Sequence, residues 1–300
     1  MPTQKERQAR EVAAQALGIP QEKFLRVHQM GGITNENFYL ATAEEEIMLR
    51  LPGKCTETLD RPQEEKNAAA AARAGLNPST LYFSRETGVK ITRYIHGAVT
   101  LDAALARKPE IMRKSAALLR RLHDTLPPFE NVFDPFALYD AYLARNADEF
   151  AGVFAGFEAS RRVFAALRPA LEALGLRSCP CHNDTLADNL VMERDGGLYL
   201  IDWEYSGQND PMWDVAGHML ESGFSDAQQE QFLTLYLGAP PTRRDRQKVL
   251  LFQLCQDLLW SAQTMAKTLA GENQYEYALG RYERAQGLLR EYRSRYGELG

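Results

Sequence analysis

The 300-residue chain is 45% hydrophobic and 25% charged, which is typical of a soluble globular protein with one large domain or two lobes. Its formal net charge of −5 gives no electrostatic reason to bind nucleic acid or an anionic membrane. No apolar run approaches the roughly 18 residues of a membrane helix, and residues 1–7 lack the apolar segment of a signal peptide. Four cysteines are too few for a disulfide scaffold, so we expect a cytoplasmic protein with reduced thiols and no membrane insertion.

The first third of the chain combines two helical segments with several short strand-like segments. Thr3-Gln4-Lys5-Glu6 fits a capping box, and the helix that it opens should end at Gly18-Ile19-Pro20. A second, alanine-rich helix is expected over residues 63–74, before a helix stop at Gly75-Leu76-Asn77-Pro78. The strand-like segments cover residues 24–28, 37–41, 46–51, 80–83 and 88–95.

A glycine pair lies in the loop between the first two of these strands. Gly31 and Gly32 would let backbone N–H groups approach phosphate oxygens, and Thr34 and Asn35 can add side-chain donors. A Gly-Gly pair between antiparallel strands most often forms only a hairpin. The loop is therefore a candidate phosphate-binding cover, and motifs elsewhere in the chain must decide between this role and a simple hairpin.

A cation interrupts the third strand, which reads Ile47-Met48-Leu49-Arg50-Leu51. Arg50 needs a carboxylate or phosphate partner if it faces inward, and it can also simply face solvent on alternate residues. Glu64 or Glu65 on the following helix could be its partner, and the spacing from the helix stop favours Glu64. Acidic residues in a first helical turn also favour the helix dipole, so the choice between the two stays open.

Helical patterns replace strands after Tyr94-Ile95-His96-Gly97. We therefore place a lobe boundary here, with one lobe over residues 1–95 and a second over 96–300. The helices expected in the second lobe cover residues 101–106, 109–123, 135–150, 160–174, 209–221, 242–269 and 274–296, with a further one starting at a capping box at Ser225.

Three polar residues in the second half have the order that phosphoryl transfer needs. Asp184 and Asn189 lie in a short polar loop, and Asp202 ends a strand-like segment over residues 198–201. One carboxylate can orient the attacking hydroxyl and accept its proton, while an amide oxygen and a second carboxylate can hold magnesium on ATP phosphates. Each residue alone could be a turn former or cap, but the ordered set favours the chemistry.

The spacing of these residues also resembles a known group. His182-x-Asp184-x-x-x-x-Asn189, followed by Ile201-Asp202, resembles the protein-kinase-like small-molecule kinases, which include aminoglycoside phosphotransferases and choline/ethanolamine kinases. Asp202-Trp203-Glu204-Tyr205-Ser206 and the later Trp213-Asp214 resemble the D-F-E-Y-S and F-D-I segments of choline kinases, and Gly31 to Asn35 resembles their G-G-x-[ST]-N loop. The resemblance implies an α+β, two-lobed protein-kinase-like fold, with a small antiparallel-sheet N-lobe and a larger, mainly helical C-lobe.

The resemblance also implies residue roles. Asp184 would be the catalytic base, and Asn189 and Asp202 would bind Mg²⁺. Arg50 would contact the ATP phosphates and pair with Glu64. Backbone groups around Arg93 and Ile95 would hydrogen-bond adenine, while Asp214 would brace the catalytic loop. His182 is expected to be a structural hydrogen-bonding residue.

A quaternary ammonium group has no N–H to donate, so its site needs aromatic faces and a carboxylate. The resemblance to choline kinases assigns this role to Glu221, Trp260 and Tyr277. The family commonly has two tryptophans three positions apart, and here only Trp260 is present, with Asp257 three residues before it. Asp257 could act as a second carboxylate or could favour a primary amine such as ethanolamine.

These observations together predict an ATP-dependent kinase that phosphorylates the hydroxyl of a small amino alcohol, most simply choline. The same chemistry on ethanolamine, thiamine, an aminoglycoside or a sugar is the nearest alternative. An inactive nucleotide-binding pseudokinase is a remote alternative, because it would be expected to lack Asp184, Asn189 or Asp202. A homodimer is compatible with the sequence, which does not determine oligomeric state.

Overall fold

The computed structural model describes residues 3–31, 35–53 and 59–299. Its internal contacts divide the chain into two units, one formed by Met1–Thr100 with Leu190–Glu204 and the other by Leu101–Asn189 with Tyr205–Gly300. The lobe boundary at residue 95 stays a prediction, and the two units are described separately below. Among the described residues, no helix combines the length and apolar character needed to cross a membrane.

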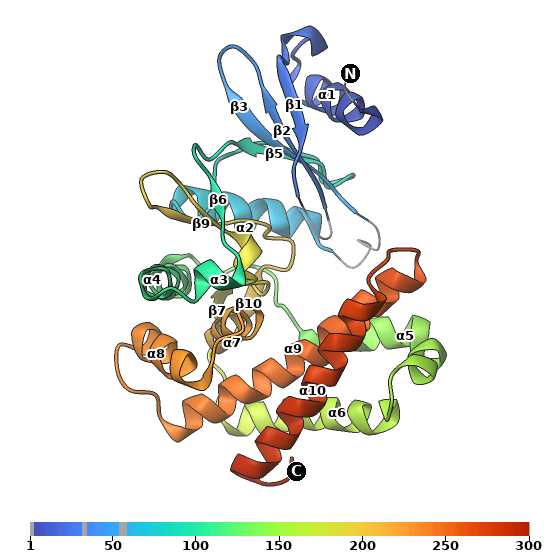
Figure 1. The fold of residues 1–300 in the computed structure, drawn as a ribbon, viewed down its shortest axis with the longest axis vertical. Coiled ribbons are helices and arrows are strands. Elements are labelled where there is room, and N and C mark those ends of the chain that lie inside the picture. The colour runs from blue at the N-terminus through green and yellow to red at the C-terminus, as the bar shows by residue number, and fades with distance from the viewer. Residues whose placement is uncertain (1–2, 32–34, 54–58, 300) are drawn as a thin grey trace. The chain divides into compact units, whose positions relative to one another are not determined.

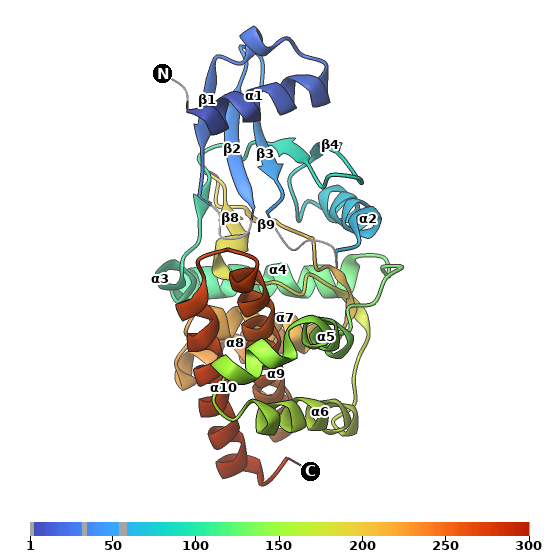
Figure 2. The ribbon, with the colours of Figure 1, turned by 90° about the vertical axis from the view of Figure 1, so that its right-hand side faces the viewer.

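The first unit is built on a five-stranded antiparallel sheet in the order β1-β2-β3-β5-β4. Helix α1 (Gln4–Leu17) lies along one face of this sheet (Figures 1 and 2). Ala9 and Ala13 of the helix pack there against inward side chains such as Phe38 and Leu49. The strands are β1 (Arg26–Gln29), β2 (Glu36–Ala41), β3 (Glu46–Leu51), β4 (Thr80–Phe83) and β5 (Lys90–Arg93).

The opposite face of the sheet carries the basic residues. Successive side chains on a strand point to opposite faces, so Arg50, next to the core residue Leu49, points away from α1. The register pairs Arg50 with Asn37 on β2 and with Lys90 on β5. Helix α2 (Arg61–Arg73), which begins at the N-cap Asp60, supplies one acidic partner of this face, Glu64.

A second, three-stranded sheet completes the first unit. It pairs β6 (Val99–Thr100) with β8 (Leu190–Met192), and β8 with β9 (Leu198–Leu200). The backbone N–H of Leu200 donates to the carbonyl of Leu76, which ties β9 to the turn after α2. The chain then reaches Asp202, which has a positive φ of 65°. The predicted strand over 198–201 is therefore present, and it leads directly to the predicted metal ligand.

The second unit is a helical assembly around α9 (Arg243–Leu269), whose residues 248–265 are buried almost without interruption. Helix α10 (Tyr275–Tyr296) lies along α9 (Figure 1). A short antiparallel pair, β7 (Cys179–Cys181) and β10 (Gly207–Asn209), precedes α7. The other helices are α3 (Ala103–Ala106), α4 (Pro109–Thr125), α5 (Pro135–Val153), α6 (Phe157–Ala173), α7 (Pro211–Glu221) and α8 (Asp226–Leu237).

The predicted α+β fold is confirmed, and the capping motifs place the helix ends well. Thr3 and Ser225 both form the predicted capping boxes, and α1 ends at Gly18 in the left-handed conformation. Helix α2 begins two residues before the predicted start, because Asp60 caps it and Pro62 is tolerated in the first turn. Cys179, Cys181 and Cys255 are free thiols, and Cys55 lies outside the described residues.

Candidate active site

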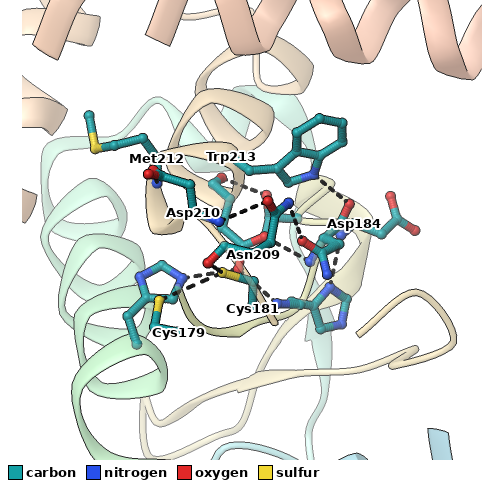
Figure 3. A network of polar contacts seen from close by, with 12 residues as sticks. Cys179, Cys181, Asp184, Asn209, Asp210, Met212 and Trp213 are labelled. Atoms are coloured by element: carbon teal, nitrogen blue, oxygen red, sulfur yellow. Dashed lines mark hydrogen bonds and ion pairs between the residues drawn. The ribbon is translucent and has the colours of Figure 1, made fainter. Parts of the chain in front are cut away.

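Asp184 lies on a loop of the second unit that a buried carboxylate holds in place. Asp214 is fully buried at the start of α7, and it accepts hydrogen bonds from the backbone N–H groups of His182 at 2.8 Å and Asn183 at 2.7 Å. Its Oδ2 also lies 3.0 Å from Nε2 of His123. Figure 3 shows Asp184 at the edge of this network. A carboxylate that binds two successive backbone donors fixes the loop just before Asp184.

Asn183 takes the left-handed backbone conformation that turns the chain before Asp184. Its φ is 68°, a value that asparagine tolerates better than most residues. Its Nδ2 donates to the carbonyl of Tyr205 at 2.9 Å, and its Oδ1 accepts from Nδ2 of Asn209 at 2.9 Å. Trp213 Nε1 donates to the Asn183 carbonyl at 3.0 Å. These three contacts offset the backbone cost and set the direction of the next residue.

Asn189 contacts Asp184 directly within the same unit. Its Nδ2 donates to the Asp184 carbonyl at 2.8 Å and to Asp184 Oδ2 at 3.1 Å. Because the amide nitrogen is used in this way, the amide oxygen is the atom that Asn189 can offer to a metal ion. Both side chains are half-buried. The donor chemistry of Asn189 thus fits Mg²⁺, which prefers oxygen ligands.

In the first unit, Arg50 is the centre of a buried ion-pair cluster. Its Nη1 lies 2.6 Å from Glu64 Oε1 and 2.7 Å from Asp202 Oδ1. Glu64 is 2% exposed, whereas Glu65 pairs with Arg85 near the surface. The structure therefore selects Glu64 as the partner of Arg50, and it does not leave Arg50 facing solvent.

The ion-pair cluster includes further residues that no sequence pattern had indicated. Lys90 lies 3.7 Å from Glu64, and Arg61 lies 2.8 Å from the same carboxylate. Asn35 donates to Asp202 at 3.1 Å and to Glu204 at 3.2 Å. The sequence assigned Asn35 to a phosphate cover; in the structure its amide contacts the two carboxylates, and its contact with ATP phosphates stays a prediction. The partners of Lys90 and Arg61 are brought together only by the sheet register and helix α2, so spacing along the chain could not reveal them.

Asp202 is oriented from two sides within the first unit. Arg50 binds its Oδ1, and Asn35 donates to its Oδ2. Its side chain is 23% exposed, which is more than the 3% of Glu204. A partly exposed carboxylate of fixed orientation is a suitable oxygen ligand for Mg²⁺.

Glu204 should give the protein an unusual pH dependence. Burial raises the pKa of Glu204 to about 7, and the charge of Asp202 adds to this effect, while Arg50 opposes it. The pKa of a glutamate in an unfolded chain is about 4.3, so the folded protein holds this proton more tightly. The resulting stabilisation is complete below about pH 4 and is lost as the pH rises toward 7.

We therefore expect the free energy of unfolding of the wild type, relative to Glu204→Gln, to fall by on the order of 1–3 kcal/mol between about pH 4 and about pH 7. Urea denaturation of both proteins across this range, in metal-free buffer without nucleotide, measures the difference. Parallel curves for the two proteins would show that Glu204 does not titrate in this way.

The predicted nucleotide-binding residues are only partly visible. Gly31 is exposed, and its carbonyl accepts from Asn37 at 3.2 Å, while Gly32 and Thr34 lie outside the described residues. The Arg93 N–H donates to the carbonyl of Ser79, and the Ile95 carbonyl accepts from Ala98. Contacts of all these residues with ATP stay predictions.

Aromatic residues of the second unit gather around Trp260. The ring of Tyr205 lies edge-on at 5.0 Å, and that of Phe133 lies at 6.2 Å. The Tyr205 hydroxyl accepts a hydrogen bond from Gln263, and Trp260 itself is 7% exposed. Tyr277 on α10 is exposed, with the Arg281 guanidinium 5.1 Å from its ring centre. Tyr205 thus supplies a second aromatic ring beside Trp260. The sequence analysis looked only for a second tryptophan and did not assign Tyr205 to the site.

The two carboxylates assigned to the acceptor lie close to two arginines. Asp257 is fully buried and accepts hydrogen bonds from Arg281 and Arg284. Glu221, at the end of α7, is ion-paired with the same two arginines at 2.9 and 2.8 Å. Arg284 was not among the predicted site residues, because an arginine on an amphipathic helix is usually a surface residue.

Comparison with known proteins then identifies the fold. Residues 27–250 match the phosphotransferase enzyme family. The chain belongs to this family. Among the relatives of this phosphotransferase is Protein LicA of Haemophilus influenzae, which is 32% identical over 288 residues, covering 91% of this chain and 84% of the relative.

Solved structures also support membership of the phosphotransferase enzyme family. The choline kinase LicA from Streptococcus pneumoniae superposes with a TM-score of 0.85 at 31% identity, over 97% of this chain and all of that chain. A LicA structure in complex with AMP superposes with a TM-score of 0.82 at 30% identity, with the same coverage. The family and the kinase-like fold implied by the residue motifs are thus confirmed, and a nucleotide is bound by a similar structure.

Proposed function

We propose that the chain is an ATP-dependent kinase that transfers the γ-phosphoryl group to the hydroxyl of choline, giving phosphocholine. The observation that carries the proposal is the Asp184 loop, which Asp214 braces and to which Asn189 is hydrogen-bonded. The similarity to choline kinase LicA over almost the entire chain supports choline as the acceptor. The requirement for ATP and Mg²⁺ suits the cytoplasm, which we propose as the location.

Each residue has a defined task in this proposal. Asp184 orients the acceptor hydroxyl and accepts its proton as the oxygen attacks the γ-phosphorus. Asn189 and Asp202 offer oxygen ligands that would hold a magnesium ion, which would neutralise charge on the phosphates. Arg50, oriented by Glu64, provides guanidinium donors to the phosphate oxygens.

The acceptor cation is proposed to lie against aromatic faces. Trp260 and Tyr277 offer π faces that attract a quaternary ammonium by about 1–2 kcal/mol each when desolvated. Tyr205 lies beside Trp260 and adds to the aromatic surface. Glu221 lies in the same group of residues, ion-paired with Arg281 and Arg284. Ethanolamine is the second candidate acceptor, since the residues assigned to the acceptor include two carboxylates, Glu221 and Asp257, although both are paired with these arginines.

Identification of the product tests this proposal directly. Incubation of the protein with Mg·ATP and choline should give ADP and phosphocholine, which ³¹P NMR distinguishes from inorganic phosphate. ATP hydrolysis alone, or no change in the ATP spectrum under conditions in which the protein is folded, would count against the proposed activity.

A further inference from the structure

Four charged side chains of the second unit form a closed network beside the proposed acceptor residues. Asp257 Oδ1 lies 3.1 Å from Arg281 Nη1 and 2.7 Å from Arg284 Nη2, and its Oδ2 accepts from Arg284 Nε at 2.7 Å. Glu221 Oε1 lies 2.9 Å from Arg281 Nη2 and 2.8 Å from Arg284 Nη2. Arg284 therefore bridges both carboxylates.

The network leaves few carboxylate lone pairs for another donor. A carboxylate accepts about four hydrogen bonds, and Asp257 already accepts three from the two arginines while it is fully buried. A primary ammonium has three N–H donors that need acceptors when it leaves water, whereas a quaternary ammonium has none. Because the arginines engage three of the lone pairs of Asp257 and the Oε1 atom of Glu221, the site disfavours the primary amine more than the quaternary one.

The network also carries no excess negative charge, because its two arginines balance its two carboxylates. Arg281 is 5% exposed and Arg284 is 38% exposed at the side chain. The guanidinium of Arg281 lies over the ring of Tyr277. Partial burial raises the pKa of the Tyr277 hydroxyl, and the charges of Glu221 and Asp184 both raise this pKa further. The network is thus part of the surroundings of the proposed acceptor site.

We propose that Arg284 is a specificity-determining residue, which withholds Glu221 and Asp257 from a primary ammonium and so favours quaternary over primary amino alcohols. Arg284 acts through these two carboxylates and is a positioning residue. The inference rests on the proposed function, because it concerns the acceptor of that reaction.

The test compares kcat/KM for choline and ethanolamine in the wild type and in Arg284→Met. Loss of the Arg284 charge should change the binding of both acceptors. The carboxylate oxygens that it releases should improve the binding of ethanolamine alone, because only ethanolamine has N–H donors. We expect the choline-to-ethanolamine ratio to fall about tenfold, which corresponds to about 1.4 kcal/mol. The change should come from a lower KM for ethanolamine, with the KM for Mg·ATP unchanged.

Arg290→Met is the matched control, because Arg290 is an exposed arginine on the same helix, and its ratio should equal that of the wild type. If Arg284→Met does not fold, Arg284→Gln makes the same comparison with a smaller loss of packing. Tetramethylammonium and methylammonium have no hydroxyl and cannot be phosphorylated, so their inhibition of choline phosphorylation reports cation binding alone. The substitution should lower the inhibition constant of methylammonium more than that of tetramethylammonium.

The outcomes separate this inference from the proposed function. A wild type that phosphorylates neither alcohol would overturn both. A wild type that is active on choline, with the same acceptor ratio in both Arg284 variants, would overturn the role of Arg284 alone. A selective gain for ethanolamine and for methylammonium would support it.

Discussion

Replacement of Asp184 by asparagine is expected to lower kcat by about 10²- to 10⁴-fold, the range that a positioned general base contributes. Asparagine keeps the shape of the side chain and can still accept the hydrogen bond from Asn189, which lies 3.1 Å from Asp184 Oδ2. It cannot accept the proton of the acceptor hydroxyl. The loop should keep its conformation, because Asp214 holds the backbone N–H groups of the two residues before Asp184.

Steady-state kinetics with saturating Mg·ATP and choline measure this effect, and circular dichroism checks the fold. Asp188→Asn is the control, since Asp188 is an exposed carboxylate of the same loop and should retain nearly full activity. Comparable activity in Asp184→Asn and in the control would contradict the assignment of the base.

Removal of the Asp214 carboxylate should have the largest effect on stability. In Asp214→Ala, the buried N–H groups of His182 and Asn183 lose this acceptor. Nε2 of His123 also loses its contact with Oδ2. Each unsatisfied buried donor costs about 1–3 kcal/mol, so we expect a loss of about 3–5 kcal/mol in the free energy of unfolding. Activity should fall with it, because the loop that carries Asp184 is no longer held.

Urea denaturation and kcat provide the two measurements for this variant. Asp214→Asn keeps one oxygen and most of the volume, so its loss of stability should be smaller while its activity still falls. Asp140→Ala, at an exposed position on α5, should change the stability by less than about 0.5 kcal/mol. Wild-type stability in Asp214→Ala would refute the bracing role.

Local sequence patterns predicted the regular elements because their causes are local. The capping boxes at Thr3 and Ser225 act within one helical turn, and both start the helices that they predict. The strand β3 has the predicted bounds, since its apolar run from Ile47 to Leu49 continues through Arg50 to Leu51, just before Pro52.

The elements that the sequence did not predict depend on distant partners. Strands β7 and β10 have three residues each, which is too short for a period to be visible, and they exist because Gly207 pairs with Cys181. The partners of Lys90 are likewise set by the register with Arg50 and by the position of α2. The bridge by Arg284 between α7 and α9 could not be inferred from spacing, since its two carboxylates are 36 residues apart in sequence.

The acceptor specificity of the wild type tests the central claim most directly. ADP release from Mg·ATP would be measured with choline, ethanolamine and thiamine offered separately. We expect kcat/KM for choline to exceed the other two by at least about tenfold, as aromatic faces and occupied carboxylates favour a quaternary ammonium alcohol with a free hydroxyl. Turnover on ethanolamine or thiamine that equals or exceeds turnover on choline would contradict the account of the acceptor site.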